Sequence, residues 1–458
     1  MPGLADKKEA SRRLIVRLTL AFYLLLVLDG ALRKWVMPGL EKPLIFVKDI
    51  AVVAIYFQAL RHGWWPKDSR LLKGGLVLAI VFVLVAAVQG LVLQLPLKVV
   101  IYGLRMYLWL LPLAFVVGEC FRPRDLKPVF KYTVLSLLPM AVLAAGQYAT
   151  SRDSFLNRTV TGEAAYRFVE EVARCSGTFS GKDGFLSYLS SAEPLVIASW
   201  MLLPVDRPVP RLALIASSIG LLIQLVINGN RTPLLQLFFS LLVAAGSTLW
   251  LLRGKVRRRG MRNIMVLALG GLLIAGLFLK RQVEQLSERM ALREEGANRL
   301  ELQGRLAGSL FHYWTLLPRL SPLGQGIGIG SGGGAYLAAG ARGAASRAEL
   351  YEYENSRVLG EVGILGLLYI FYKYWLIFWL GKKAIAATRR SNNPIPLQLW
   401  SYSALVFLAE RITMQNTLNG YAWLFLGLSI AANRIGSNQE KRQTDRLKPG
   451  ASQEAFHG

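Results

Sequence analysis

Three ionisable side chains stand where the chain enters a long apolar stretch: Glu354, Arg357 and Glu361. They occupy positions i, i+3 and i+7, so on a helix they share one face and Arg357 can pair with either carboxylate. Charged groups at such a boundary are costly unless they are paired or functional. Two interpretations stay open: an ion group that caps a helix, or a site in which Glu354 acts as a general base towards a hydroxyl group. In the second, Asn355 and Arg357 would contact the substrate.

Two arginines are candidates for catalysis through binding of a diphosphate. Arg231 follows the short turn 228–230 and opens an apolar stretch, and Arg305 lies in a polar segment before the aromatic residues 312–314. A guanidinium group matches phosphate oxygens with two parallel hydrogen bonds, which suits a diphosphate ligand. The alternatives are that Arg231 only snorkels to a membrane boundary and that Arg305 is a solvated loop charge.

Three further arginines are candidates for binding the substrate: Arg174, Arg289 and Arg411. Arg174 precedes a turn-rich segment, where it could contact a phosphate or a sugar. Arg289 lies in a long polar loop, and the alternative is that it is solvated or contacts lipid headgroups. Arg411 follows Glu410 in an apolar stretch. Because adjacent helical residues point about 100° apart, the alternative for this pair is separate ion pairs with other helices.

The remaining candidate ligands do not indicate a metal or another cofactor. The three histidines, His62, His312 and His457, are far apart, and the two cysteines, Cys120 and Cys175, are predicted on opposite sides of a membrane. No spacing typical of a metal site is present, and no disulfide framework is implied. The formal net charge of +26 could suggest nucleic acid. Basic residues gather instead in short loops between apolar stretches, so we expect no nucleic-acid partner.

The elements that must position these residues are membrane-spanning helices. Hydrophobic residues make up 53% of the 458 residues, and the mean hydropathy is +0.38. Several apolar runs are long enough to span about 30 Å of hydrocarbon, and they are continuous rather than alternating, which disfavours a β-barrel. We predict an all-α, polytopic integral membrane protein with about twelve transmembrane helices, near residues 14–28, 44–60, 74–92, 99–117, 129–148, 185–203, 212–227, 234–252, 264–279, 358–380, 399–414 and 421–432.

Charge fixes the expected orientation and the domain organisation. Short loops on one side carry most of the lysines and arginines, so both termini are expected in the cytoplasm. No cleavable signal peptide is evident. Residues 1–279 would hold about nine transmembrane helices and an outer loop at 149–184. Residues 280–356 would form one large periplasmic loop that contains short helices, 357–435 about three more transmembrane helices, and 436–458 a disordered cytoplasmic tail.

Three segments in order resemble the bacterial O-antigen ligase/polymerase superfamily. The first is an arginine after a short outer loop, at residues 230–235. The second runs from Arg305 through an aromatic helix to the Pro-Leu-Gly-Gln-Gly element at 322–326. The third pairs Glu354-Asn355 with the Gly-Ile-Leu-Gly element at 363–366. The resemblance covers roughly residues 177 to 372. Ligases of this family typically carry His where this chain has Glu354.

The resemblance implies an inverting, metal-independent membrane glycosyltransferase with a GT-C-like fold in the bacterial inner membrane. Its donor would be an undecaprenyl-diphosphate-linked glycan and its acceptor another glycan or lipid, with membrane lipids and polysaccharide-assembly proteins as further partners. Arg231 and Arg305 would hold the diphosphate, and Glu354 would orient or deprotonate the acceptor. The missing histidine favours a polymerase of oligosaccharide repeat units. The alternatives are an O-antigen ligase that transfers the glycan to a lipid A core, and a transporter or flippase of lipid-linked sugars.

Overall fold

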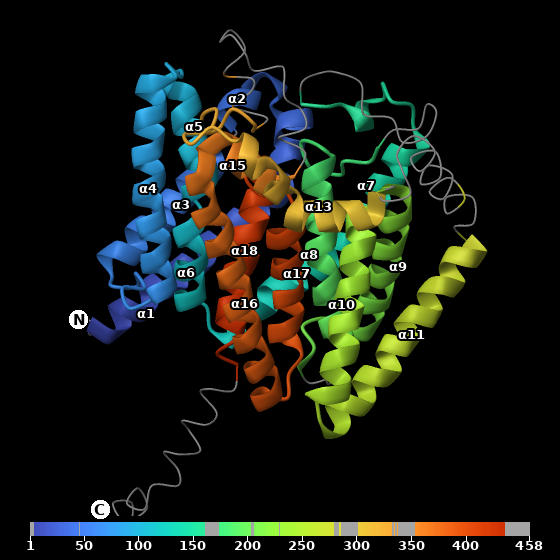
Figure 1. Ribbon diagram of the computed structural model, residues 1–458. Helices are drawn as coiled ribbons and strands as arrows, with labels where there is room; N and C mark the ends of the chain where they lie inside the picture. Colours follow the sequence, from blue (N-terminus) through green and yellow to red (C-terminus); the bar gives the residue numbers. More distant parts are fainter. Residues whose placement is uncertain are drawn as a thin grey trace, which may run out of the picture.

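The chain forms a bundle of helices, seen in a computed structural model (Figure 1). The structure describes residues 4–44, 46–160, 174–202, 206–228, 230–278, 284, 301–331, 334, 337 and 353–435. Within these ranges every regular element is a helix, in agreement with the predicted all-α class. The predicted tail at 436–458, Arg289 and most of the large loop lie outside the described residues.

The first half of the chain contributes eight of the longer described helices and five short elements. The longer helices are α1 (Leu4–Ala31), α3 (Val47–Arg61), α4 (Arg70–Val92), α5 (Leu97–Leu108), α6 (Leu111–Cys120), α7 (Leu126–Ala149), α8 (Lys182–Met201) and α9 (Arg211–Asn228). The short elements, each of a turn or so, are η1 (Leu32–Val36), η2 (Pro38–Leu40), α2 (Glu41–Leu44), η3 (Pro123–Asp125) and η4 (Phe155–Asn157).

The second half continues in the same way. Its helices are α10 (Arg231–Trp250), α11 (Gly254–Phe278), α13 (Glu301–Leu316), α15 (Glu354–Val362), α16 (Gly366–Ser391), α17 (Ile395–Ala409) and α18 (Asn416–Ala432). Single turns of helix occur at η6 (Leu317–Arg319) and η8 (Gly363–Leu365). Figure 1 shows α13 lying across one end of the bundle, while α8, α10, α16, α17 and α18 run along it.

Local sequence explains where several of these helices begin and end. Ser69 caps α4, because its side-chain oxygen accepts a hydrogen bond from the Leu72 amide at 3.2 Å. Proline stands in the first turn of α6 and of α17, where its missing amide proton costs nothing. α16 ends at Asn392, which adopts the left-handed conformation at φ 50° and closes the helix.

Seven helical stretches among the described residues are long and apolar enough to cross a membrane: Asp6–Val36, Arg70–Val92, Leu97–Cys120, Pro123–Ala149, Arg211–Asn228, Thr232–Trp250 and Glu354–Ser391. These stretches are those of a polytopic membrane protein. The other predicted spans coincide with α3, α8, α11, α17 and α18, which are shorter or more polar. The count of twelve spans and the GT-C-like arrangement stay predictions.

Two predicted spans differ from the structure in their boundaries. The expected single helix at 99–117 is split into α5 and α6, which meet at Trp109 and Leu110. Pro112 follows in the first turn of α6, and because it has no amide proton it cannot continue the hydrogen-bond ladder of α5. The expected span at 399–414 ends as a helix at Ala409, so Glu410 and Arg411 lie in an extended segment beyond α17 and not within a helix.

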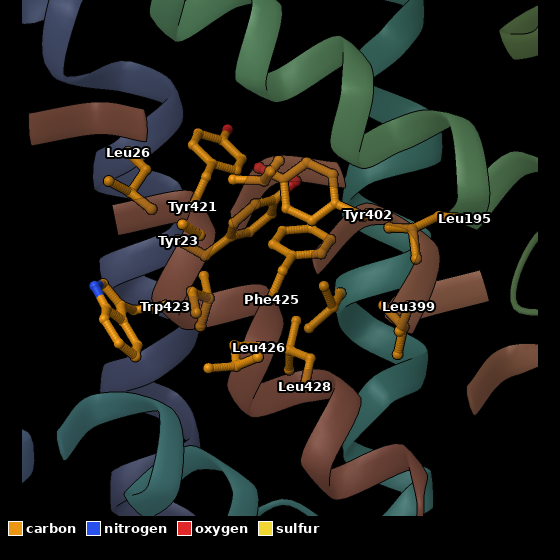
Figure 2. Packing of buried hydrophobic residues seen from close by; sticks show 14 of the residues in the cluster. Tyr23, Leu26, Leu195, Leu399, Tyr402, Tyr421, Trp423, Phe425, Leu426 and Leu428 are labelled. Carbon is orange, nitrogen blue, oxygen red and sulfur yellow. The ribbon is translucent and has the colours of Figure 1, made fainter. Parts of the chain in front are cut away.

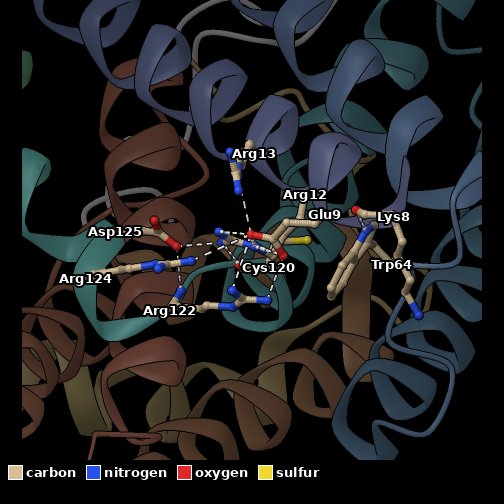
Figure 3. A network of polar contacts seen from close by, with 9 residues as sticks. All are labelled: Lys8, Glu9, Arg12, Arg13, Trp64, Cys120, Arg122, Arg124 and Asp125. Carbon is tan, nitrogen blue, oxygen red and sulfur yellow. Dashed lines mark hydrogen bonds and ion pairs between the residues drawn. The ribbon is translucent and has the colours of Figure 1, made fainter. Parts of the chain in front are cut away.

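We call the end of the bundle that holds the start of α1, the α3–α4 connection and the α6–α7 connection the basic end. A network of ion pairs and hydrogen bonds joins these segments (Figure 3). Arg12 binds Asp125 at 2.6 Å and the Cys120 carbonyl at 2.9 Å, and Arg122 binds Glu9 at 2.7 Å. The Trp64 indole donates to the Lys8 carbonyl at 3.1 Å. α2, α13 and α15 lie at the opposite end, the loop end (Figure 1).

Aromatic side chains fill the centre of the bundle between α1, α17 and α18 (Figure 2). Tyr402 and Phe425 meet edge to face with ring centroids 4.9 Å apart, and Tyr23 meets Tyr421 at 6.1 Å. Edge-to-face contacts of this kind add to the packing of large rings. Since lipid tails are as apolar as these side chains, close packing of this kind is what holds the helices together and fixes the loop end above them.

Candidate functional site

The predicted ion group exists as three side chains of α15. Arg357 donates from Nη2 to the Glu354 carboxylate at 3.0 Å and from Nη1 to the Glu361 carboxylate at 2.9 Å. Arg357 and Glu361 are 0% exposed and Glu354 is 3% exposed. The helical spacing thus brings the three charges together as expected. Further protein groups bind both carboxylates, whereas the buried Nε atom of Arg357 has no hydrogen-bond partner within the described residues.

The Glu361 carboxylate holds a glycine-rich segment. Its oxygens accept hydrogen bonds from the Gly328 amide at 3.1 Å, the Gly330 amide at 2.7 Å and the Tyr107 hydroxyl at 2.7 Å. Gln89 supports the same segment, because its amide group donates to the Leu323 carbonyl and to the Glu361 carbonyl. Residues 322–331 are therefore fixed on α4, α5 and α15 in a turn conformation, consistent with the expectation that they do not form a helix.

The Glu354 carboxylate holds a second segment, the connection between α17 and α18. It accepts from the Thr413 hydroxyl at 2.8 Å and from the Thr413 amide at 3.2 Å, in addition to its contact with Arg357. Both oxygens of Glu354 are thereby engaged. These contacts favour the ion-group interpretation over that of a general base. A role for Glu354 in proton transfer stays a prediction that requires it to leave Thr413.

Asn355 is likewise enclosed by protein. Its amide nitrogen donates to the Ser309 carbonyl and to the Tyr374 hydroxyl, each at 2.7 Å, and its oxygen accepts from Lys373 at 3.1 Å. Asn355 is 1% exposed. Asn355 therefore joins α15 to α13 and α16, whereas the ion pairs of Arg357 stay within α15.

A pocket lies at the loop end on the other side of Thr413, between α8, α10, α17 and α18. Its cavity has a volume of about 30 Å³ and is partly open to the surroundings. Its polar wall contains two carboxylates and one guanidinium group beside amides and hydroxyls: Asp183, Ser187, Ser190, Thr232, Gln236, Glu410, Arg411 and Gln415. The Gln415 side chain donates a hydrogen bond to Asp183, which ties α8 to the segment before α18.

The elements that carry the predicted arginines meet near this pocket. Arg411 lines it, and Arg231 is the first residue of α10, directly before the lining residue Thr232. Arg305 lies on α13, one turn before Ser309, whose hydroxyl donates to the Ala409 carbonyl at the end of α17 at 3.4 Å. The glutamate–arginine group of α15 approaches the same segment through Thr413.

Arg174 does not belong to the elements that meet near the pocket, and lies in the segment before α8. That segment is anchored by Lys34, which donates to the Ser176 hydroxyl at 3.0 Å and to the Gly177 carbonyl at 2.8 Å. The neighbouring Cys175 is fully buried and its thiol donates to the Ala144 carbonyl at 3.2 Å. Burial raises the pKa of the Cys175 thiol to about 12. Arg289 lies outside the described residues.

Sequence reasoning missed most of the polar residues in the pocket. Asp183 stands in the first turn of α8. A carboxylate at the start of an apolar stretch could have been recognised from the sequence as a candidate. Ser187, Ser190 and Gln236 gave none, because isolated polar residues in apolar helices have many structural uses. The inward surface of α8 goes on beyond the pocket to Glu193, which is 0% exposed and accepts no hydrogen bond within the described residues.

A neighbouring ion pair fixes the start of α18, which forms one side of the pocket. Arg105 binds the Asp49 carboxylate at 2.7 Å and donates to the Asn416 side chain at 2.6 Å. Asn416 is the first residue of α18 and follows Gln415. Among the described residues, no three or more histidine, cysteine, aspartate or glutamate side chains are placed to hold a metal ion.

Neither a scan against protein-family models nor a search of the curated proteins gave a match for this chain.

Proposed function

We propose that this protein is a membrane glycosyltransferase that polymerises undecaprenyl-diphosphate-linked oligosaccharide units into a surface or extracellular polysaccharide. The observation that supports the proposal is the polar pocket at the loop end, which Arg411 lines, with α10 beginning beside it at Arg231 and α13, which carries Arg305, packed on α17. A departing diphosphate needs positive charge where its own charge develops, and preorganised guanidinium groups supply it. In a bacterial cell the protein would lie in the inner membrane with this pocket on the periplasmic side.

The bond changes assign roles to the charged residues of the pocket. The acceptor hydroxyl oxygen attacks C1 of the donor sugar from the face opposite the diphosphate, which inverts the configuration. The C1–O bond to phosphate breaks, and its electron pair leaves with the lipid diphosphate that the arginines hold. The hydroxyl proton passes to a carboxylate of the wall, Asp183 or Glu410, since both line the pocket.

Glu354 acts in this proposal as a positioning residue. It binds Thr413 through the amide and the hydroxyl, and Thr413 lies two residues after Arg411 in the same short segment. Fixing this segment fixes the guanidinium group before substrate arrives. Preorganisation of that kind lowers the reorganisation that the transition state would otherwise require.

The experiment uses the purified protein in lipid nanodiscs with a polyprenyl-diphosphate-linked oligosaccharide and follows product length. Arg411→Gln and Asp183→Asn should each lower turnover by about a hundredfold or more, the range for a lost charge-stabilising group or proton acceptor. Arg13→Gln is the matched control, because Arg13 is 65% exposed at the basic end. Full turnover in both pocket variants would refute the proposal.

The nature of the product separates the alternatives of the same class. Chains of increasing length indicate a polymerase, whereas transfer of one intact glycan to a lipid A core indicates a ligase. Movement of the lipid-linked sugar across the nanodisc or vesicle membrane without any new glycosidic bond would assign the protein to the transporters.

A further inference from the structure

Four arginines from three segments converge at the basic end of the bundle, away from the proposed active site. Arg207 belongs to the connection between α8 and α9, Arg211 opens α9, and Arg259 and Arg262 lie on the first turns of α11. We refer to these four residues as the arginine group. Within the described residues, none of them forms an ion pair with a carboxylate, and Asp206, directly before Arg207, is exposed.

Close packing of α11 on the end of α8 holds the arginine group in place. The Asn263 side chain donates to the Trp200 carbonyl at 2.6 Å, and the Trp200 indole donates to Ser218 of α9 at 3.0 Å. The Arg207 guanidinium lies 6.0 Å from the centre of the Trp200 ring. A Cβ at Gly260 would lie 3.0 Å from the Thr248 hydroxyl, so α10 and α11 approach closely here as well.

The charges of the arginine group act on one another. The Nε atom of Arg207 is buried and has no hydrogen-bond partner within the described residues. Burial lowers the pKa of Arg207, and the like charges of Arg259, Arg211 and Arg262 lower it further. A guanidinium group with an unused donor beside like charges is costly unless an anion binds to it.

Apolar side chains next to the arginine group face outward. Leu212, directly after Arg211, is 79% exposed, and Met261 and Met265 on α11 are 49% and 60% exposed. A free phosphate would gain nothing from these surfaces, whereas the acyl chains of a lipid would cover them. The bias of basic residues to one side of a membrane explains arginines in these loops, but it does not require them to converge.

We propose that the arginine group binds the phosphate of an anionic phospholipid, with the glycerol-linked chains lying along the exposed surface of α9 and α11. Basic pockets between transmembrane helices are suited to such headgroups. The site would lie in the leaflet opposite to that of the proposed active site. It is independent of the proposed function, because no residue of the loop-end pocket belongs to it.

The test is native mass spectrometry of the detergent-solubilised full chain with added phosphatidylglycerol, phosphatidylcholine or inorganic phosphate. The protein should retain phosphatidylglycerol in preference to phosphatidylcholine. Arg207→Gln with Arg262→Gln should weaken retention about tenfold or more. Arg257→Gln with Arg258→Gln removes the same charge from exposed positions of the same helix and should leave retention unchanged.

Each other result would overturn the proposal. Equal loss in both double variants would show a general charge effect, and equal retention of phosphatidylcholine would show apolar adsorption only. Displacement of the lipid by millimolar inorganic phosphate, with no preference for lipid, would identify a free-phosphate site instead. Arg262→Gln alone guards against misfolding, because Arg262 is exposed, and its unfolding temperature in the absence of lipid should match that of the unaltered protein.

Discussion

Arg357 is the side chain on which the buried charges of the loop end depend. It lies between two carboxylates, at 3.0 Å from Glu354 and 2.9 Å from Glu361, and is 0% exposed. Replacement by Met leaves two buried carboxylates without a cation, and loss of one partner of a buried pair costs about 3–5 kcal/mol. We expect Arg357→Met to lower the unfolding temperature sharply, as measured by intrinsic fluorescence in detergent.

The ion pair between Arg13 and Glu9 provides the comparison. Its nitrogen and oxygen lie 3.5 Å apart, and Arg13 is 65% exposed, so Arg13→Gln should cost less than about 1 kcal/mol. A similar, small effect of both substitutions would mean that α15 is not held by its buried charges.

Glu354 and Asp183 can be told apart by their pH dependence. If Glu354 positions the segment around Thr413, then Glu354→Gln keeps an acceptor for Thr413 and lowers turnover about tenfold or less without changing the shape of the pH–rate profile. Asp183→Asn, by contrast, should remove the acidic limb of that profile if Asp183 accepts the proton. The measurement is turnover of the lipid-linked oligosaccharide across pH 5 to pH 9. Loss of the acidic limb in Glu354→Gln alone would return the role of base to Glu354.

The Cys175 thiol should be inert in the folded protein. It is 0% exposed, and with a pKa of about 12 its thiolate fraction at pH 9 is about one in a thousand. Raising the pH from 7 to 9 increases this fraction but leaves it small, so a maleimide should label Cys175 only after unfolding. Asp153→Cys in a chain with both native cysteines replaced by Ser supplies an exposed control that should label at once. Labelling of native Cys175 at pH 7 would contradict the buried position.

At the residue scale the sequence predicted groups but not their partners. The spacing of Glu354, Arg357 and Glu361 was enough to place them on one helical face. The groups that bind the two carboxylates, Thr413 on Glu354 and the Gly328 amide on Glu361, come from segments that lie far away in the chain. Glu354, which the sequence predicted as a free carboxylate, therefore forms hydrogen bonds with other protein groups, and Asp183 lines the pocket instead.

At the scale of elements, the glycine-rich segment depends on a close approach to α5. A Cβ on Gly103 would lie 2.7 Å from the Gly328 backbone nitrogen, and Gly328 itself has φ +90°. Since backbone atoms cannot move aside as a side chain can, Gly103→Ala should displace the segment and cost about 1–3 kcal/mol. The readouts are the unfolding temperature and the turnover of the lipid-linked oligosaccharide.

Gly90→Ala in the adjacent helix α4 is the matched control for this element. No atom lies within 4 Å of a Cβ at that position, so the substitution should be neutral or mildly stabilising. Equal behaviour of the two alanine variants would show that the segment does not rest on α5.

Hydropathy predicted where most helices lie but not how far each extends. Residues 99–117 read as one continuous apolar run, yet the chain turns at Trp109 and Leu110 before Pro112. The run at 399–414 leaves the helix after Ala409 and forms a turn at residues 412–414, where the Thr413 amide donates to the Glu354 carboxylate. The apolar content of a segment measures its preference for lipid. The residue at which a helix ends depends on tertiary hydrogen bonds, which hydropathy does not measure.

At the scale of the whole molecule, the basic connections lie at one end of the bundle and the pocket lies at the other. The contact of Trp64 with Lys8 and that of Arg12 with Asp125 place the α3–α4 and α6–α7 connections beside the start of α1. α7 then leads from Leu126 to Ala149, and a helix of 24 residues is about 36 Å long. Asp68 and Asp153 therefore lie at opposite ends of the bundle, and both are exposed.

This separation gives a direct test of orientation in a bacterial cell. With both native cysteines replaced by Ser, Asp153→Cys should react with a membrane-impermeant maleimide in cells with a permeabilised outer membrane, whereas Asp68→Cys should react only after lysis. The physical reason is the charge bias, since the connection that holds Asp68 also carries Arg61, Lys67, Arg70 and Lys73. The reverse pattern would place the arginine-lined pocket in the cytoplasm, where a periplasmic polymerase could not use it, and labelling of both positions from outside would mean that α7 does not cross the membrane.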